Sequence, residues 1–226
     1  MNFELKVYPD RAAQAESAAK LMGELMQNAI ARKGAASIAL SGGTTPAPMF
    51  RSLAALDLPW EHVSITLTDE RWVPVTSDRS NHRLLNDTLL AGFADASRFV
   101  PLYAEDEAPD TGLAATNAAL QDVILPLDIA VLGMGADMHT ASLFPDATGL
   151  DAALAEDAPA AVAIVAPGAD EPRVTLSAPV LRSAERHLFI HGQEKRAALH
   201  RAVDIADPVI APVCAILDGA TVHYAD

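Results

Sequence analysis

Residues 37–46 read SIALSGGTTP, and the chain is best interpreted outward from this stretch. The run that ends at Leu40 is short and apolar, as in the buried strands of parallel sheets. Pro46 suits the first turn of a helix, which we expect to continue to about Leu56. The stretch therefore predicts a buried strand, a tight loop and a helix, in that order.

The loop between this strand and this helix has the composition of an anion-binding turn. Gly42 and Gly43 allow the backbone to approach a ligand closely. The hydroxyls of Ser41, Thr44 and Thr45, with the free N–H groups of the helix's first turn, favour an anion such as phosphate. An ordinary capped turn would look the same in sequence. The Gly-Lys-Ser/Thr ending of a nucleotide-binding P-loop is absent.

Short apolar strands alternate with helical stretches along the rest of the chain. We expect strands at residues 3–8, 37–40, 63–67, 99–102, 128–132, 161–165, 174–176, 187–191 and 221–224, the last as an edge strand. Helices are expected between Asp10 and Gly34 and over residues 46–56, 81–90, 111–124 and 194–203, with a solvated acidic loop at 103–110. This alternation implies βαβ units, and hence a largely parallel sheet covered on both faces. Because no linker divides the chain, residues 1–226 are predicted to form a single α/β domain.

Composition excludes several classes of protein. Of the 226 residues, 50% are hydrophobic and 20% are charged, which excludes a disordered chain and a disulfide scaffold. The net charge of −14 argues against a nucleic-acid partner, because binding to phosphate backbones needs a basic face. The single cysteine, Cys214, fits a reducing compartment. With neither a signal-peptide pattern nor a membrane-spanning apolar stretch, we expect a cytoplasmic protein without a membrane partner.

A second polar segment, residues 68–74, directly follows the strand at 63–67. It reads Thr-Asp-Glu-Arg-Trp-Val-Pro. Ligands of parallel α/β sheets bind beyond the carboxyl ends of the strands, so Arg71 is a candidate for forked recognition of a phosphate or carboxylate. An exposed ion-pair network among Asp69, Glu70 and Arg71 is the structural alternative.

A third segment, residues 133–145, follows the strand at 128–132 and contains Asp137 and His139. The unperturbed pKa of histidine is roughly 6.5, so this side chain can accept a proton near neutral pH. A carboxylate two residues away could orient the ring or stabilise its charged form. We interpret His139 as a general base, with a purely structural histidine as the alternative.

Arg173 and Lys195 are more dispersed candidates for phosphate binding. Either could instead be an ordinary surface charge, since spacing alone does not bring them together.

Other chemistries fit the sequence less well. It has no paired-histidine metal motif, no thiolate-rich site, no Gly-x-Ser-x-Gly elbow and no dinucleotide fingerprint. The sequence therefore predicts neither a metal nor a cofactor.

Taken together, the loops at 41–46, 69–74 and 132–145, with Ser80 and Asn81 downstream, resemble the 6-phosphogluconolactonase family. The resemblance implies a modified Rossmann-type sheet. It also implies hydrolysis of 6-phospho-D-glucono-1,5-lactone to 6-phosphogluconate, the second step of the oxidative pentose phosphate pathway. The partner would be this phosphorylated sugar lactone, bound by a monomer or a small homo-oligomer.

The resemblance also implies roles for individual residues. His139 matches the family's general base, with Asp137 beside it, and the loop 41–45 matches the sugar-phosphate loop. Met138 departs from the pattern, since the family usually has glycine before the histidine. A positive φ at this position would strain a methionine or reshape the loop. The family's cationic positions, for the phosphate or the developing charge, are matched by Arg71, Lys195 and Arg173.

Two rival functions fit the same loops. A 6-phospho-amino-sugar deaminase or sugar-phosphate isomerase would use a similar phosphate loop. Such deaminases usually continue after the histidine with an Ile-Ala-Phe-Asn type sequence, whereas residues 140–145 here read TASLFP. The second rival is a sugar-phosphate-sensing module, which would not need His139 as a base.

Overall fold

A computed structural model describes residues 1–105, 108–169 and 171–226, and its centre is a seven-stranded sheet. The strand order is β1-β10-β9-β6-β2-β3-β5, and every neighbouring pair is parallel. The predicted α/β fold with a largely parallel sheet is confirmed. The bounds are β1 (Glu4–Val7), β2 (Ala36–Leu40), β3 (Val63–Leu67), β5 (Arg98–Val100), β6 (Ile129–Gly133), β9 (Glu185–His191) and β10 (Thr221–Ala225).

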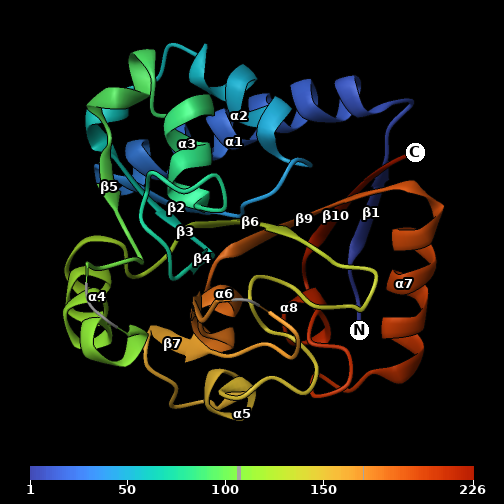
Figure 1. The fold of residues 1–226 in the computed structure, drawn as a ribbon. Helices are drawn as coiled ribbons and strands as arrows, with labels where there is room; N and C mark the ends of the chain where they lie inside the picture. Colours follow the sequence, from blue (N-terminus) through green and yellow to red (C-terminus); the bar gives the residue numbers. More distant parts are fainter. Residues whose placement is uncertain (106–107, 170) are drawn as a thin grey trace.

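Helices cover both faces of this sheet (Figure 1). Helices α1 (Arg11–Lys33), α2 (Ala47–Ala54) and α3 (Asn81–Thr88) gather on one side, and α6 (Ala178–Ser183), α7 (Gly192–Ile205) and α8 (Cys214–Leu217) on the other. Local sequence explains the ends of α1. The Asp10 side chain accepts a hydrogen bond from the Ala13 N–H, and Gly34 ends the helix with φ 86°. The remaining helical segments are η1 (Trp60–His62), η2 (Gly92–Ala96), α4 (Pro109–Val123) and α5 (Leu150–Leu154).

Two of the predicted strands belong to a separate sheet. Strands β7 (Ala161–Ile164) and β8 (Arg173–Leu176) pair antiparallel with each other, and β8 pairs with β4 (Asp69–Arg71). The polar segment after β3 is therefore partly a strand, not a loop throughout. Its three consecutive charged residues lack the alternating apolar pattern of a strand, and among the described residues β4 pairs only with β8, which is distant in the sequence.

Two further expectations differ in detail. Residues 221–224 were expected at a sheet edge, but β10 lies between β1 and β9. The reason is that β1, from the start of the chain, pairs with β10 and takes the edge itself. The predicted acidic loop at 103–110 lies partly outside the described residues, and α4 begins within it at Pro109.

The fold brings several polar loops to one edge of the sheet. Strands β2, β3, β6 and β9 all run in the same direction, so the segments that follow them emerge at their carboxyl ends. Beneath these loops lies a core whose buried apolar side chains form one connected cluster, including Leu40, Leu67, Leu132 and Ile190. Across the described residues, no helix combines the length and apolar character needed to span a membrane.

Candidate active site

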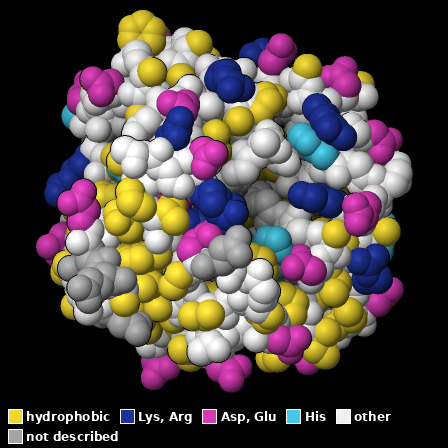
Figure 2. Space-filling view, in the orientation of Figure 1, with side chains coloured by type: hydrophobic (Ala, Val, Ile, Leu, Met, Phe, Trp, Pro, Cys, Tyr) yellow, Lys and Arg dark blue, Asp and Glu magenta, His cyan; other side chains and the backbone are white. Residues whose placement is uncertain are grey.

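A cavity of about 270 Å³ opens at the carboxyl ends of β2, β6 and β9. Figure 2 shows the hollow near the centre of this face, with lysine or arginine side chains and a histidine at its rim. Among the predicted site residues, only Asp137 does not line it. The predicted residues that do are Ser41, Gly42, Gly43, Thr44, Thr45, Arg71, His139, Arg173 and Lys195.

The loop between β2 and α2 forms one wall of the cavity. Gly43 has φ 91°, a conformation that L side chains rarely adopt. At Gly42, a Cβ atom would overlap the side-chain amide of Asn81, so the two walls meet here without room for a side chain. The hydroxyl of Ser41 is buried and has no hydrogen-bond partner among the described residues. A buried, unpaired hydroxyl facing a cavity is suited to binding a ligand oxygen.

Arg71 and Arg173 lie opposite each other because β4 and β8 pair in that register. Arg71 donates from Nη1 to the carbonyl of Arg79 at 2.5 Å. The Nε–H groups of both Arg71 and Arg173 are buried and have no partner among the described residues. Burial lowers the pKa of Arg173, and the nearby charge of Arg71 lowers it further, partly offset by Asp69. These two cations supply the forked donors that an anion needs.

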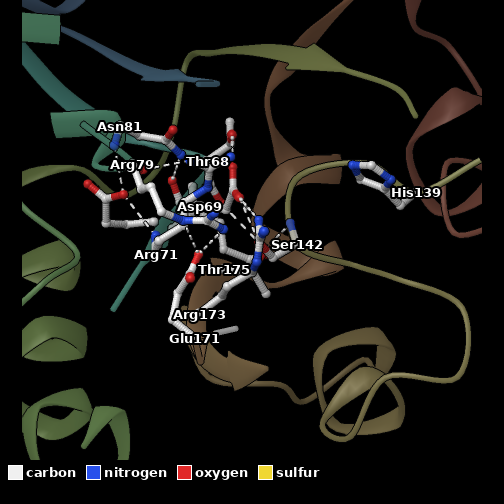
Figure 3. Close-up of polar contacts among 12 residues, drawn as sticks. Thr68, Asp69, Arg71, Arg79, Asn81, His139, Ser142, Glu171, Arg173 and Thr175 are labelled. Atoms are coloured by element: carbon white, nitrogen blue, oxygen red, sulfur yellow. Dashed lines mark hydrogen bonds and ion pairs between the residues drawn. The ribbon is translucent and has the colours of Figure 1, made fainter. Parts of the chain in front are cut away.

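Asp69 balances part of this charge and was not among the predicted site residues. Its Oδ2 accepts a hydrogen bond from the Ser142 hydroxyl at 2.6 Å and lies 3.8 Å from Nη1 of Arg173 (Figure 3). Asp69 as a residue is 6% exposed and lines the cavity. A contact between residues 69 and 142 depends on the fold, so no sequence pattern indicated it.

Glu70 has a different, structural position. Its carboxylate accepts hydrogen bonds from the N–H groups of Arg71, Asn81 and His82 and from the Ser80 hydroxyl. Burial raises its pKa, and these four hydrogen bonds counteract the rise. Glu70 thus joins β4 to the start of α3. Because it is 1% exposed, the alternative of an exposed ion-pair network is wrong. Asn81, at the start of α3, also lines the cavity. It is part of the stretch that resembles the family, but it was not predicted as a site residue.

His139 lies on the loop after β6, across the cavity from the arginines (Figure 3). Its Nδ1 is 2.6 Å from Oδ1 of Asp137, and this hydrogen bond lowers the pKa of the Asp137 carboxyl. Nε2 has no hydrogen-bond partner among the residues that the structure describes. An imidazole held at one nitrogen by a carboxylate, with the other nitrogen free, has the arrangement of a general base.

The backbone around His139 is unusual. Met138 has φ 68°, so a methionine is held in the left-handed region that was expected to strain it. The loop is fixed around this residue. The N–H of Met138 donates to the Gly135 carbonyl, and its own carbonyl accepts from Val213, both at 3.0 Å. Strained backbone of this kind costs on the order of 1–3 kcal/mol and is concentrated at functional sites.

Lys195 reaches the cavity from the first turns of α7. Burial lowers its pKa, while the negative charges of Asp137 and Glu194 raise it again in part. No ion pair holds its ammonium group among the described residues. Nor do those residues contain a group of three or more histidine, cysteine, aspartate or glutamate side chains placed to hold a metal ion.

The fold and this cavity define a class of α/β protein with a cation-lined anion pocket and a histidine–aspartate pair at its strand ends. A model of the glucosamine-6-phosphate isomerases/6-phosphogluconolactonase family matches residues 9–224, and the chain belongs to this family. A 6-phosphogluconolactonase of Rhizobium meliloti is 41% identical over 220 residues, covering 96% of this chain and 94% of the relative. One of Mesorhizobium japonicum is 42% identical over 224 residues, covering 97% and 92%.

A solved structure agrees with these relatives. The crystal structure of a 6-phosphogluconolactonase from Shewanella baltica superposes with a TM-score of 0.96 at 30% identity, covering 100% of this chain and 98% of that one. The likeness extends over the parallel sheet and the smaller antiparallel sheet together, because it covers the whole chain. The expected resemblance to the 6-phosphogluconolactonase family is therefore confirmed.

Proposed function

We propose that this protein hydrolyses 6-phospho-D-glucono-1,5-lactone to 6-phospho-D-gluconate. The proposal rests on one observation. His139, hydrogen-bonded to Asp137, lines a cavity that is also lined by Arg71, Arg173 and Lys195. A phosphorylated lactone needs both features, a cationic site for its phosphate and a base beside its carbonyl. The two relatives described above are both named 6-phosphogluconolactonase, which supports the same reaction.

In this proposal the phosphate is bound by the loop 41–45 together with Arg71, Arg173 and Lys195. The glycines bring backbone N–H groups close to the phosphate, and the hydroxyls of the loop donate further hydrogen bonds. The arginines contribute forked donors, which hold the phosphate oxygens in a defined orientation. Binding energy from the phosphate then positions the lactone carbonyl near His139.

The chemical step is general-base hydrolysis. Nε2 of His139 accepts a proton from water while the water oxygen bonds to C1 of the lactone, and Asp137 stabilises the resulting imidazolium. The tetrahedral oxyanion is stabilised by a hydrogen-bond donor of the cavity wall, either a loop N–H group or a cationic side chain. Its collapse breaks the bond between C1 and the ring oxygen, which takes the proton back from His139. No metal enters this scheme, so protein treated with EDTA is expected to keep its rate.

The test is hydrolysis of freshly prepared lactone, followed as acid release against the spontaneous reaction. Turnover well above that background supports the proposal. Ammonia release from glucosamine 6-phosphate would instead identify a deaminase. Binding of 6-phosphogluconate without turnover of either substrate would identify a sensing module. Either of these two results contradicts the proposed function.

Ser41→Ala is expected to raise KM roughly fivefold without lowering stability, since a hydrogen bond contributes about 1 kcal/mol. The Ser41 hydroxyl has no protein partner to lose. Ser37→Ala is the matched control on the preceding strand, β2, because its hydroxyl lies within hydrogen-bond distance of the Asp128 carboxylate and the Pro126 carbonyl. The control is expected to lower the melting temperature and leave KM unchanged. Equal KM values for the two variants would contradict a ligand-binding role of Ser41.

Gly135→Ala is expected to lower kcat at least about tenfold, because a 1 Å displacement of a reacting group can cost about a hundredfold. A Cβ atom at this position would overlap the Asp137 carboxylate and the His139 ring. Met138→Gly tests the same loop without that overlap, and glycine readily adopts the φ of 68° observed there. We expect Met138→Gly to retain kcat. If Gly135→Ala also retains it, the loop geometry does not limit the reaction.

We further propose that residues 1–226 form one domain, since the buried apolar side chains form one connected cluster. The net charge of −14 supports the absence of a nucleic-acid partner, and the single cysteine supports a cytoplasmic location. The oligomeric state, a monomer or a small homo-oligomer, is directly measurable by light scattering.

A further inference from the structure

Phe144 contacts two residues of the cavity wall although the cavity lining does not include it. Its ring stacks on His139, with centroids 4.1 Å apart and planes inclined by 28°. The guanidinium of Arg173 lies over the same ring, 5.1 Å from its centroid. The 5.1 Å separation is within the range of favourable cation–π contacts, and the 4.1 Å separation is a close face-to-face contact of two stacked rings. One half-buried side chain thus touches the candidate base and a candidate phosphate ligand.

The hydrogen bond to Asp137 does not by itself orient the His139 ring. It fixes the position of Nδ1, but the last torsion of a histidine side chain has a broad energy profile. The ring can therefore turn about this contact, which moves Nε2 relative to the cavity. A flat neighbour packed on the ring face removes that freedom, because rotation would break the stack. Phe144 is in this position.

The segment that carries Phe144 is itself firmly held. Ser142 donates from its hydroxyl to Asp69 and from its N–H to the Thr175 hydroxyl. Leu143 is fully buried, and its N–H donates to the Thr140 carbonyl. The backbone before Phe144 is therefore anchored to both β4 and β8, the strands that carry the two arginines. The ring is presented from a rigid support.

We propose that Phe144 is a positioning residue, which holds the imidazole of His139 in the plane that directs Nε2 into the cavity and supports the guanidinium of Arg173 on the same ring. The inference rests on the proposed function, in which His139 is the base and Arg173 binds phosphate. Phe144 contributes no reacting atom. Its effect on kcat passes through His139 and its effect on KM passes through Arg173.

Phe144→Leu removes the flat ring while keeping an apolar side chain. It is expected to lower kcat about tenfold or more, as misplacement of a reacting group does, and to raise KM. Phe144→Tyr keeps the ring and is expected to restore both constants. Phe99→Leu is the matched control, because Phe99 packs on His82 with a similar geometry, 4.3 Å and 33°, and neither lines the cavity. This control is expected to change neither constant.

The decisive measurement repeats Phe144→Leu in a His139→Ala background. If Phe144 acts through the base, the substitution has no further effect on kcat there, while KM still rises through Arg173. An equal loss of kcat in both backgrounds would overturn the proposal, because it would show a general structural effect. Wild-type values of both constants for Phe144→Leu would overturn it as well.

NMR separates this inference from the proposed function and does not require any variant to fold. In the wild-type protein, the ring protons of His139 are expected to show cross-relaxation with those of Phe144 and an upfield ring-current shift. If the protein does not hydrolyse the lactone but shows these signals, the proposed function fails, although Phe144 still packs on the His139 ring and orients it. If it hydrolyses the lactone without them, the positioning role fails.

Discussion

Replacing His139 with alanine is expected to lower kcat by about 10²–10⁴, which is the usual contribution of a general base. The variant loses the only imidazole whose free nitrogen faces the cavity among the described residues. The substitution leaves the cationic side chains Arg71, Arg173 and Lys195 in place, so KM is expected to change much less than kcat. Stopped-flow or pH-stat assays of fresh lactone, corrected for spontaneous opening, measure both constants.

Asp137→Asn is the comparison that tests how the base is held. The amide keeps the size of the side chain but loses the negative charge that stabilises the imidazolium. We expect a smaller loss of kcat than for His139→Ala, and no further loss when the two substitutions are combined. A His139→Ala protein that turns over at the wild-type rate would exclude His139 as the base.

Acid is expected to destabilise the protein strongly through a buried histidine pair that lies outside the cavity. His187 of β9 and His223 of β10 are 1% and 0% exposed, and their Nδ1 and Nε2 atoms share a hydrogen bond of 3.0 Å. His223 also shares a hydrogen bond of 2.8 Å with the Tyr8 hydroxyl. Burial, reinforced by the nearby charge of Lys6, lowers the pKa of His187 to about 4.

The pKa of His223 is lowered to about 3, first by burial and then by the charges of His187 and Lys6. Below pH 6.5 the unfolded chain therefore binds protons that the native protein does not, so stability falls as the pH falls toward 4. A shift from 6.5 to about 4 corresponds to about 3 kcal/mol, a large part of the stability of an ordinary domain. Glu185, 3.3 Å from Nε2 of His187, is too exposed to offset much of this loss.

Urea unfolding between pH 7.5 and 4.5 measures this loss directly. His223→Gln cannot be protonated, so its stability is expected to be lower at pH 7.5 but to fall less steeply with acid. His200→Gln on the exposed side of α7 is the matched control and is expected to follow the wild-type slope. If His223→Gln loses stability as steeply as wild type, other groups cause the acid sensitivity.

Much of the fold could be predicted because its signals are local. Asp10 and Gly34 cap α1 as expected, since capping involves groups only a few residues apart. The alternation of apolar strands and helices implied parallel βαβ units, and that architecture is confirmed. The pairing of β4 with β8 was not predictable, because its hydrogen bonds join residues about a hundred positions apart.

The candidate site likewise has residues that the sequence alone indicated and residues that only the fold brought together. The Asp137–His139 pair and the loop at 41–45 are each contained in a few consecutive residues, so the sequence alone determined them as candidates. Pairing between strands that are distant in the sequence decides which loops face each other. The pairing of β4 with β8 places Arg71 opposite Arg173. The same pairing placed the buried Asp69 beside Arg173, where no spacing rule indicated it.

The sequence by itself thus determined the fold class and the local chemistry of each loop, because dihedral preferences, caps and short motifs act over a few residues. Tertiary structure alone decided the cavity in which those loops meet and the contacts of Phe144 with His139 and Arg173. The physical reason is that packing and strand register depend on chain segments far apart in sequence, whose meeting is a property of the whole core.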